Sequence, residues 1–476
     1  MQIALVLLLL GVRVVSTLTD GRSQETTGME GVHAAVVRRV AAGGPLYQDI
    51  NRDSTTAIYN YGFYRVYAAV AAALPTKVPV LSGLRLFSLA MTFGAVIALA
   101  AIVAHRLPGP STWPRLLTAL ALAVPSVLGP FSGWLPLSVR PDLPAFALEF
   151  AGLALVERSG NRVRMLLGAG VLFGLAIAIK QNAVACLLFA TLSVVLGRCP
   201  RRAGWLWVGI LGAAVVGIAT SGPFYLHHTV FAPAATHMDA ASFAQSLTDA
   251  TRAGLPMLAA GLALGAWRRT RNPDAPLPLA WLILIAIGLS VPQLARFGSG
   301  RNYLIGAFAI ASVTVWLHAL SSRTRVTGLL ATTAASLQLL ITAAYLPPFN
   351  AGTLRLPPAS EELRAGVARA GADGEPPHYT DDPAVALAWT GSATRLEVTD
   401  PTVYADYVGS GAVTEPAEAR IARCVYGTLL LRGADLAGQA MAVGYSVRER
   451  WPEGRVWLTR DRCAAGDGPP QALVLD

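Results

Sequence analysis

Several acidic and basic side chains lie at the edges of long apolar runs, where they could take part in group transfer. Glu30 follows the first apolar run, and a carboxylate can accept the proton of a hydroxyl or amine within hydrogen-bond reach. Lys180, Arg296 and Arg301 lie at the ends of later runs. Lysine offers a point charge to a phosphate, and arginine can bind one with two hydrogen bonds. A base together with positive charge near a departing phosphate would serve transfer from a phosphate-linked donor.

Each of these residues also has a structural interpretation that the sequence leaves open. Glu30 could be a solvated loop acid, and Arg296 and Arg301 could be snorkelling arginines at helix ends. Lys180 fits snorkelling less well, because it lies inside an apolar hairpin with Gln181 beside it. Ionisable groups at such depth usually face a cavity. Lys180 is therefore the stronger candidate for a phosphate contact.

Other polar pairs offer further candidates. Asp49 and Asp53 could form a carboxylate pair or bind a metal, although aspartates often cap turns. Arg140 and Asp142 flank a proline at the head of an apolar run, and we expect them to pair and fix the start of that helix. A group in a later loop has no standard zinc spacing, and its members are His227, His228, His237 and Asp239. The sequence thus allows a divalent metal without requiring one.

The composition requires lipid as part of the solvent. The 476 residues are 54% hydrophobic and only 14% charged, whereas soluble domains have about a quarter charged residues. The net charge of +10 does not indicate nucleic-acid binding, because the arginines form short clusters between apolar runs. That distribution is typical of the cytoplasmic loops of membrane proteins. No glycine-rich phosphate loop or nucleotide fingerprint is present in the sequence.

Apolar runs of spanning length predict an α-helical polytopic membrane protein with about eleven spans. They fall near 2–19, 80–104, 116–137, 143–157, 165–180, 182–197, 205–223, 253–267, 278–295, 303–320 and 326–346. With the N-terminus inside, most arginine clusters are cytoplasmic. The first loop, residues 20–79, is then outside, and it contains a helical stripe of valines between Met29 and Ala42. We expect an amphipathic helix on the membrane surface there.

The composition changes after the last span. Residues 1–346 form the expected membrane domain, and residues 347–476 are richer in proline, glycine and acids. Short apolar runs there predict a small α/β domain outside the membrane. The predicted elements are a helix at Glu361–Ala370 and strands at Arg395–Thr399, Ala422–Leu431 and Arg455–Thr459. Cys424 and Cys463 lie in this domain, where they could form a disulfide or be two unrelated thiols.

The order of several short motifs resembles the GT-C class of membrane glycosyltransferases. The motifs are Glu30-Gly31 after the first span, Gly44-Pro45-Leu46-Tyr47-Gln48-Asp49, Arg85 with Ser88, Arg140-Pro141-Asp142, Lys180-Gln181, and Asn302-Tyr303. The resemblance is to the bacterial branch related to protein mannosyltransferases and the lipid A aminoarabinose transferase. Many members have an aspartate before the glutamate, whereas this chain has Met29. Glu25 is a neighbouring acid that could serve instead of Glu30.

The resemblance implies a function and a set of site residues. The expected reaction is inverting transfer of a sugar from a polyprenyl-phosphate carrier to an unknown acceptor of the cell envelope. It would take place on the outer face of a bacterial cytoplasmic (inner) membrane, with Glu30 as general base and Lys180, Arg296 and Arg301 near the phosphate. Further residues that could line the site are Glu25, Tyr47, Asp49, Arg85, Arg140, Asp142, Gln181 and Tyr303.

Two other functions remain open from the sequence. The short spans on either side of Lys180 resemble the broken helices of transporters, so a flippase for lipid-linked sugars is one alternative. A noncatalytic scaffold for envelope assembly is the other. A scaffold would be unaffected by replacement of Glu30, whereas a transferase would not.

Overall fold

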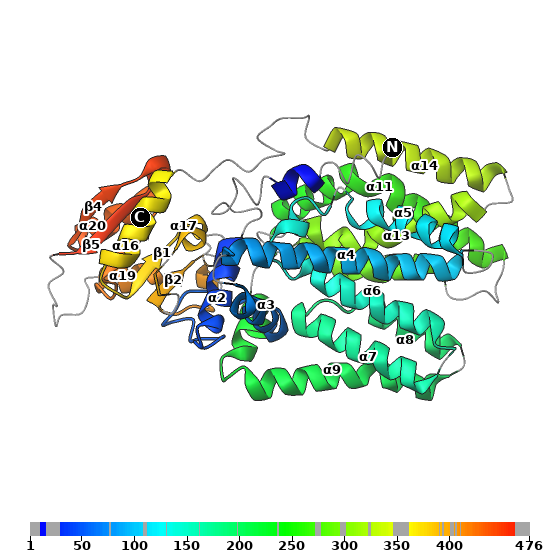
Figure 1. The fold of residues 1–476 in the computed structure, drawn as a ribbon, viewed down its shortest axis with the longest axis horizontal. Helices are drawn as coiled ribbons and strands as arrows, with labels where there is room; N and C mark the ends of the chain where they lie inside the picture. The colour runs from blue at the N-terminus through cyan, green and yellow to red at the C-terminus, as the bar shows by residue number, and fades with distance from the viewer. Residues whose placement is uncertain are drawn as a thin grey trace.

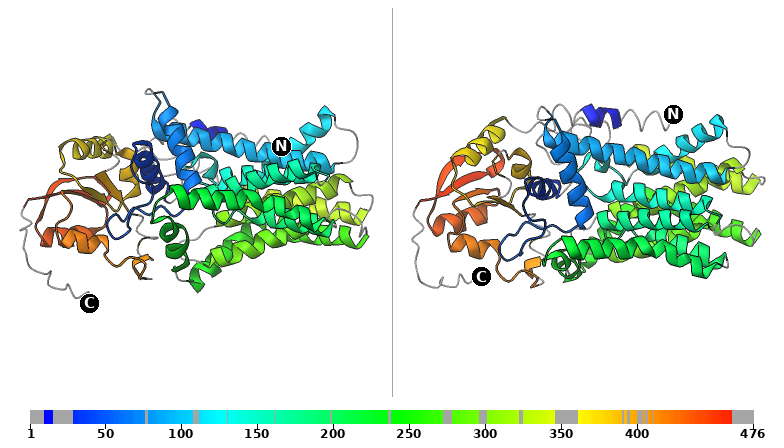
Figure 2. Two further views of the ribbon diagram at one scale, coloured as in Figure 1. Left: turned by 90° about the horizontal axis from the view of Figure 1, so that it is seen from below. Right: turned by 60° about the horizontal axis from the view of Figure 1, so that its bottom comes forward.

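The computed structural model describes residues 10–15, 29–75, 78–107, 112–129, 131–160, 162–197, 199–235, 238–271, 278–295, 301–321, 325–345, 361–389, 391–392, 395–399, 404, 407–409 and 411–461. It contains a bundle of long helices with a small sheet domain at one end (Figure 1). Two short helices, coloured blue, lie where the two parts meet (Figures 1 and 2). We call this end of the bundle the domain end.

Apolar helices make up the bundle. They are α4 (Val80–Arg106), α5 (Trp113–Val127), α6 (Asp142–Arg158), α7 (Val163–Ile179), α8 (Ala185–Leu196), α9 (Pro200–Thr220), α11 (Ala240–Arg271), α12 (Leu279–Leu294), α13 (Ile305–Ser321) and α14 (Arg325–Tyr345). Each expected span from 80–104 to 326–346 therefore has a helix at its place. The expected first span lies mostly outside the described residues. Short helices connect the bundle: η1 (Leu135–Leu137), η2 (His227–Phe231), α10 (Ala232–Ala235) and η3 (Arg301–Leu304).

Length and hydropathy support a membrane location for the bundle. Among the described residues, Val80–Arg106, Pro200–Thr220 and Asn302–Leu320 are each long and apolar enough to cross a membrane. Several other apolar helices are shorter, including α7 and α8. Small residues bring α7 and α9 together: Gly170 and Gly174 face Gly209, and a Cβ at any of the three would overlap the facing backbone. Such close packing of small residues is typical of helices in lipid.

The sheet domain has five strands in the order β2-β1-β3-β5-β4. Strands β1 (His378–Thr380), β2 (Leu396–Val398) and β3 (Thr428–Leu431) are parallel, and β4 (Tyr445–Arg450) and β5 (Val456–Arg460) are antiparallel to their neighbours. Helices α16 (Glu361–Asp373), α17 (Pro383–Ala388), α19 (Ala417–Ala422) and α20 (Ala434–Ala442), with η5 (Pro452–Gly454), complete it. The helix predicted at 361–370 is confirmed, as are strands at β2 and β5. The strand predicted over 422–431 is confirmed only at Thr428–Leu431, because α19 extends to Ala422 and the chain turns at Cys424, with a φ of 54°, before β3 begins.

Helix α2 (Glu30–Ala41) lies between the two parts of the molecule. The helix predicted at 29–42 is confirmed, and its place on the membrane surface stays a prediction. Val36 and Val37 pack in one core cluster with Phe63 and other residues of α3 (Tyr61–Ala73), a helix that the sequence analysis missed. Val32 and Ala35 belong to another cluster, with residues of α16 and α17. Helix α2 is therefore covered by protein on both sides.

Two features attach the sheet domain to α2. The guanidinium of Arg38 donates hydrogen bonds to the carbonyl oxygens of Ala386, Leu387 and Trp389, at 2.8, 3.3 and 3.1 Å. Carbonyls at the end of a helix lack intrahelical partners, so a cation is favoured there. Gly31 lies against the backbone of Pro383, at the start of α17, with no room for a Cβ.

Candidate functional site

A buried ion pair connects α2 to the bundle. Glu30 is the first residue of α2 and Arg85 lies in the second turn of α4. The Nε and Nη2 of Arg85 donate to the two carboxylate oxygens of Glu30, at 2.9 and 2.6 Å. The backbone N–H of Val139 donates a further hydrogen bond of 3.0 Å to Oε1. Glu30 has no exposed surface, so its carboxylate is held entirely by protein groups.

One turn after Glu30, His33 lies among aromatic rings. Its centroid is 4.9 Å from that of Tyr59 and 5.8 Å from that of Phe63. The hydroxyl of Tyr64 lies 3.3 Å from Nδ1, while Nε2 has no hydrogen-bond partner. Burial lowers the pKa of His33 well below its usual range, and Arg140 acts in the same direction. The imidazole is therefore neutral.

A second ion pair lies where α7 gives way to α8. Helix α7 ends at Ile179, and Lys180 begins the short break before α8. Its Nζ donates to Oδ1 of Asp142 at 2.7 Å, and Asn302 donates to the same oxygen at 2.8 Å. The Nε of Arg140 is 3.7 Å from Oδ2, so the predicted pairing of Arg140 with Asp142 is confirmed. The ammonium also lies 4.8 Å from the centre of the Tyr303 ring.

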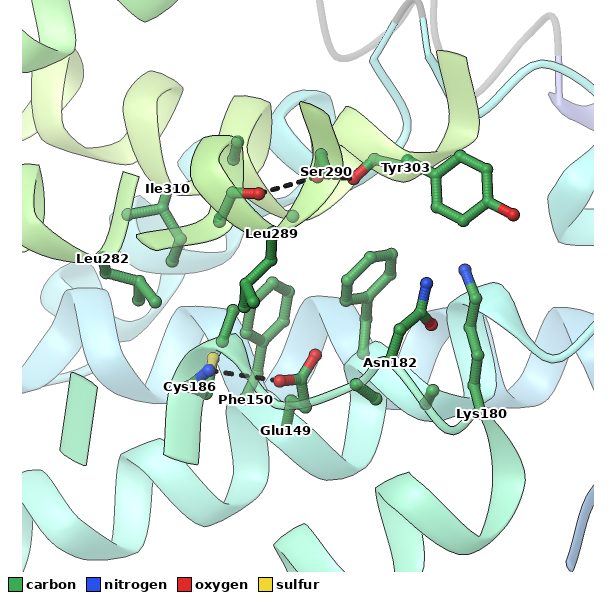
Figure 3. Close-up of a pocket in the computed structure, with 17 residues that line it drawn as sticks. Glu149, Phe150, Lys180, Asn182, Cys186, Leu282, Leu289, Ser290, Tyr303 and Ile310 are labelled. Carbon is green, nitrogen blue, oxygen red and sulfur yellow. Dashed lines mark hydrogen bonds between the residues drawn. The ribbon is translucent and has the colours of Figure 1, made fainter. Parts of the chain in front are cut away.

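Lys180 and Tyr303 line one end of a cavity inside the bundle (Figure 3). The cavity has a volume of about 50 Å³ and is bounded by α6, α8, α12 and α13, with η3 and the α7–α8 break closing one end. Most of its lining is apolar, including Phe146, Phe150 and Leu282. The ammonium of Lys180 and the ring of Tyr303 lie together at one end (Figure 3). A phosphate bound there would have an apolar volume beside it.

Tyr47 and Asp49 lie in a different place from the two ion pairs. Both line a surface cleft of about 750 Å³ that also includes Arg65 and the segment from Thr220 to Phe224. The Tyr47 hydroxyl donates to the Tyr59 carbonyl at 2.7 Å, and the Asp49 carboxylate is 3.7 Å from the Nε of Arg52. Because Tyr59 also packs on His33, the Tyr47 side chain forms part of the wall between this cleft and the buried cluster.

The structure brings most of the sequence candidates together. Two groups of contacting residues lie at the domain end. One contains Glu30 and Arg85, and the other contains Asp142, Arg140, Lys180 and Tyr303. Gln181 donates to the Ile58 carbonyl at 2.8 Å, so it joins the break to the first loop. Glu25 and Arg296 lie outside the described residues, as does the side chain of Arg301.

Sequence reasoning missed four residues of this region. His33 and Tyr59 complete the surroundings of Glu30, Asn302 binds Asp142, and Glu149 projects into the cavity. The spacing of Glu30 and His33 could have revealed the histidine, because residues three apart share a helix face. Glu149 could have been found as an acid in the middle of the apolar run at 143–157.

The described residues offer no ready metal site. None of their histidine, cysteine, aspartate and glutamate side chains form a group of three or more that could hold an ion. The Nε2 of His228 lies 2.7 Å from the Gln48 carbonyl, and Asp53 forms an ion pair of 2.5 Å with Arg39. These donor sets do not fit a divalent cation.

Comparison with solved structures places the chain among known folds. Apo ArnT from Cupriavidus metallidurans superposes with a TM-score of 0.57 at 14% identity, covering 98% of this chain and 99% of that one. ArnT bound to undecaprenyl phosphate gives a TM-score of 0.60 at 14% identity, over 97% and 98% of the two chains. The chain has the GT-C fold. The Archaeoglobus fulgidus oligosaccharyltransferase, in complex with Zn and sulfate, has it too, with a TM-score of 0.54 at 11% identity over 97% of this chain and 73% of that one.

The GT-C fold accounts for both parts of the molecule, since the ArnT superpositions extend over the bundle and the sheet domain alike. The polytopic membrane architecture predicted from the sequence is thereby confirmed. No protein-family model matches the sequence, and no curated protein matches it either.

Proposed function

We propose that the chain transfers a sugar from a polyprenyl-phosphate carrier to an acceptor at the domain end of the bundle. The observation that carries the proposal is Lys180, a buried ammonium at one end of an apolar cavity. A lipid phosphate needs both a cation for its head and an apolar surface for its chain. The fold likeness to ArnT bound to undecaprenyl phosphate supports a carrier of that kind.

The phosphate would lie against Lys180 and Arg140. These two cations share the single carboxylate of Asp142, so the group keeps an excess of positive charge. Positive charge fixed in place before the reaction stabilises the charge that develops on a leaving phosphate. Arg301, which precedes Asn302 directly in the sequence, and Arg296, a few residues earlier, would add to this charge.

In the transfer step, an acceptor oxygen or nitrogen attacks the anomeric carbon of the sugar. The bond from that carbon to the phosphate oxygen breaks, the configuration inverts, and the polyprenyl phosphate leaves with the electron pair. The acceptor proton passes to a base, and we propose Glu30 for that role. Because both oxygens of Glu30 are bound to Arg85 in the described structure, Glu30 acts as a base only after that pair opens.

The location follows from the proposed chemistry. The site, the first loop and the sheet domain would face the outer side of a bacterial cytoplasmic membrane, where a lipid-linked sugar can meet envelope acceptors. The bundle would hold the carrier chain in contact with the bilayer.

The test is sugar transfer by full-length protein reconstituted in lipid, with a panel of labelled undecaprenyl-phosphate sugars and an envelope lipid extract as acceptor. Wild type is compared with Lys180→Met, Glu30→Gln and, as a control, Arg52→Met at an exposed arginine. We expect Lys180→Met to weaken binding of the carrier, and Glu30→Gln to bind it normally while losing transfer. Carrier that crosses the bilayer with its sugar still attached would favour the flippase alternative. Full transfer by Glu30→Gln would remove that residue from the role of base.

A further inference from the structure

A pocket lies at the end of the bundle opposite the sheet domain, which we call the far end (Figure 1). This far-end pocket has a volume of about 230 Å³, and it lies where α4, α6, α11 and α13 end and α12 begins. The proposed transfer step does not use it, because that chemistry lies at the domain end. The volume is below the range of about 300–1,000 Å³ that is typical of drug-sized ligands. The pocket therefore fits a small polar group.

An ion pair with an unused donor forms one wall of the far-end pocket. The Nε of Arg106 donates to Glu157 at 2.9 Å, and Nη2 donates to the other carboxylate oxygen. Each side chain is only 12% exposed. Among the described residues, no group accepts a hydrogen bond from the third nitrogen of Arg106, Nη1. The pair thus holds a guanidinium at the pocket wall with one nitrogen left for a ligand, and arginine binds phosphate oxygens well.

The far end of the bundle is strongly basic. Its loops contain thirteen arginines and only two acidic residues, over residues 105–115, 157–164, 197–202, 268–278 and 321–325. Arg115 donates to the His105 carbonyl and Arg158 to the Ala101 carbonyl, each at 3.2 Å. These contacts offset the partial negative charge at the carbonyl end of α4. Positive charge therefore remains in excess around the pocket, and an anion is the favoured ligand.

Tryptophans place the far-end pocket at the depth of lipid headgroups. Trp267 and Trp281, each about half exposed, lie two residues after the pocket-lining Gly265 and Leu279. Further exposed tryptophans are found at the same end of the bundle, near the starts of α5 and α9, at Trp113, Trp205 and Trp207. Tryptophan is enriched where a membrane meets water. Phospholipid headgroups are therefore within reach of the pocket.

We propose that the far-end pocket binds the phosphate group of an anionic phospholipid from the leaflet at that end. Nη1 of Arg106 donates to a phosphate oxygen, and the surrounding arginines attract the negative charge. The acyl chains lie along α12, where Trp281 and Leu284 are exposed on one face. Basic pockets between membrane helices bind lipid headgroups in this way. A free phosphate has the same charge but makes no use of the apolar surface.

The test measures lipid binding to delipidated full-length protein in a mild detergent, by native mass spectrometry and by thermal protection. The probes are phosphatidylglycerol, phosphatidylcholine and inorganic phosphate. Wild type is compared with Arg106→Gln/Glu157→Gln, which removes the ion pair without changing the net charge. Arg106→Lys keeps the charge, but its single ammonium is occupied by Glu157. Arg158→Gln is the matched control, because it removes a positive charge at the same end from outside the pocket lining.

The expected result is a loss of affinity that follows the pocket and not the net charge. Wild type should bind phosphatidylglycerol about tenfold more tightly than phosphatidylcholine, and the double variant should lose about tenfold of its affinity for phosphatidylglycerol. Arg106→Lys should lose about threefold or more, and Arg158→Gln less than about twofold.

Three results would overturn the proposal. The first is equal affinity of wild type and the double variant for phosphatidylglycerol. The second is a loss with Arg158→Gln as large as that with the double variant, which would show attraction by surface charge in place of a site. The third is thermal protection by inorganic phosphate as strong as that by phosphatidylglycerol, which would assign the pocket to a soluble anion. If the double variant does not fold, Arg106→Lys decides, because lysine still pairs with Glu157 and unchanged affinity would be equally contrary.

Discussion

Arg85 and Glu30, 55 positions apart in the chain, form a buried pair with hydrogen bonds of 2.9 and 2.6 Å between the guanidinium and both carboxylate oxygens. The pair fixes the first turn of α2 against α4. Removal of one partner would leave the other charge buried without compensation, which is far more costly than loss of a surface pair.

We expect Arg85→Met to lower the free energy of unfolding by about 3–5 kcal/mol, measured from thermal or SDS unfolding in mild detergent. The double variant Arg85→Met/Glu30→Gln should recover part of that loss, because it removes the unpaired charge. Arg52→Met, at a side chain that is 87% exposed, should change stability by less than about 0.5 kcal/mol. Wild-type stability of Arg85→Met would contradict the role given to the pair.

Gly31→Ala should loosen the sheet domain from α2, since a Cβ there would overlap the Pro383 backbone. The expected result is a lower melting temperature and faster hydrogen exchange in α17. The matched control is Gly212→Ala on α9, where a Cβ meets nothing within 4 Å. That change should be neutral or stabilising by up to about 1 kcal/mol, because alanine favours a helix. Identical behaviour of the two variants would show that the close contact is unimportant.

Acidification should destabilise the sheet domain through His378. Burial, with a smaller effect of Arg395, lowers the pKa of His378 to about 4, from 6.5 in the unfolded chain. Between these values the unfolded state binds more protons than the folded state, so stability present above pH 6.5 is lost as the pH falls towards 4. Melting temperatures measured between pH 7 and pH 5 should decrease less in His378→Gln than in wild type. A parallel decrease in both would assign the pH dependence to other groups.

Met29 precedes α2 with a φ of 66°, a left-handed conformation that costs a residue with a Cβ about 1–2 kcal/mol. Glycine and asparagine adopt it more readily. We expect Met29→Asn to raise the melting temperature slightly, even though Met29 is buried. A clear decrease would mean that packing of the methionine side chain outweighs the backbone effect.

The helical bundle could be predicted from the sequence alone, because helices in lipid require long apolar runs that are visible without tertiary information. It was less informative for α2. Its valine stripe is the same pattern that a surface helix would have, and only the partners of Arg38 and Ala35 reveal a second covered face.

The sequence predicted which residues belong to the candidate site better than it predicted how those residues pair. The resemblance singled out Glu30, Arg85, Asp142 and Lys180, but no local spacing connects residues that lie on four different segments. The sequence could not show that Glu30 would be tied to Arg85, or that Lys180 would share Asp142 with Asn302.

The position of α2 between the bundle and α17 also affects how the protein is made. Arg38 and its partner Ala386 are 348 positions apart, and nearly the whole bundle is synthesised between them. During translation, α2 leaves the ribosome well before the surface that will cover its second face. The second face of α2 is therefore covered only after α16 and α17 have been synthesised and have reached the same side of the membrane. A truncated product that ends before them would insert its helices and still leave Val32, Ala35 and Arg38 of α2 uncovered.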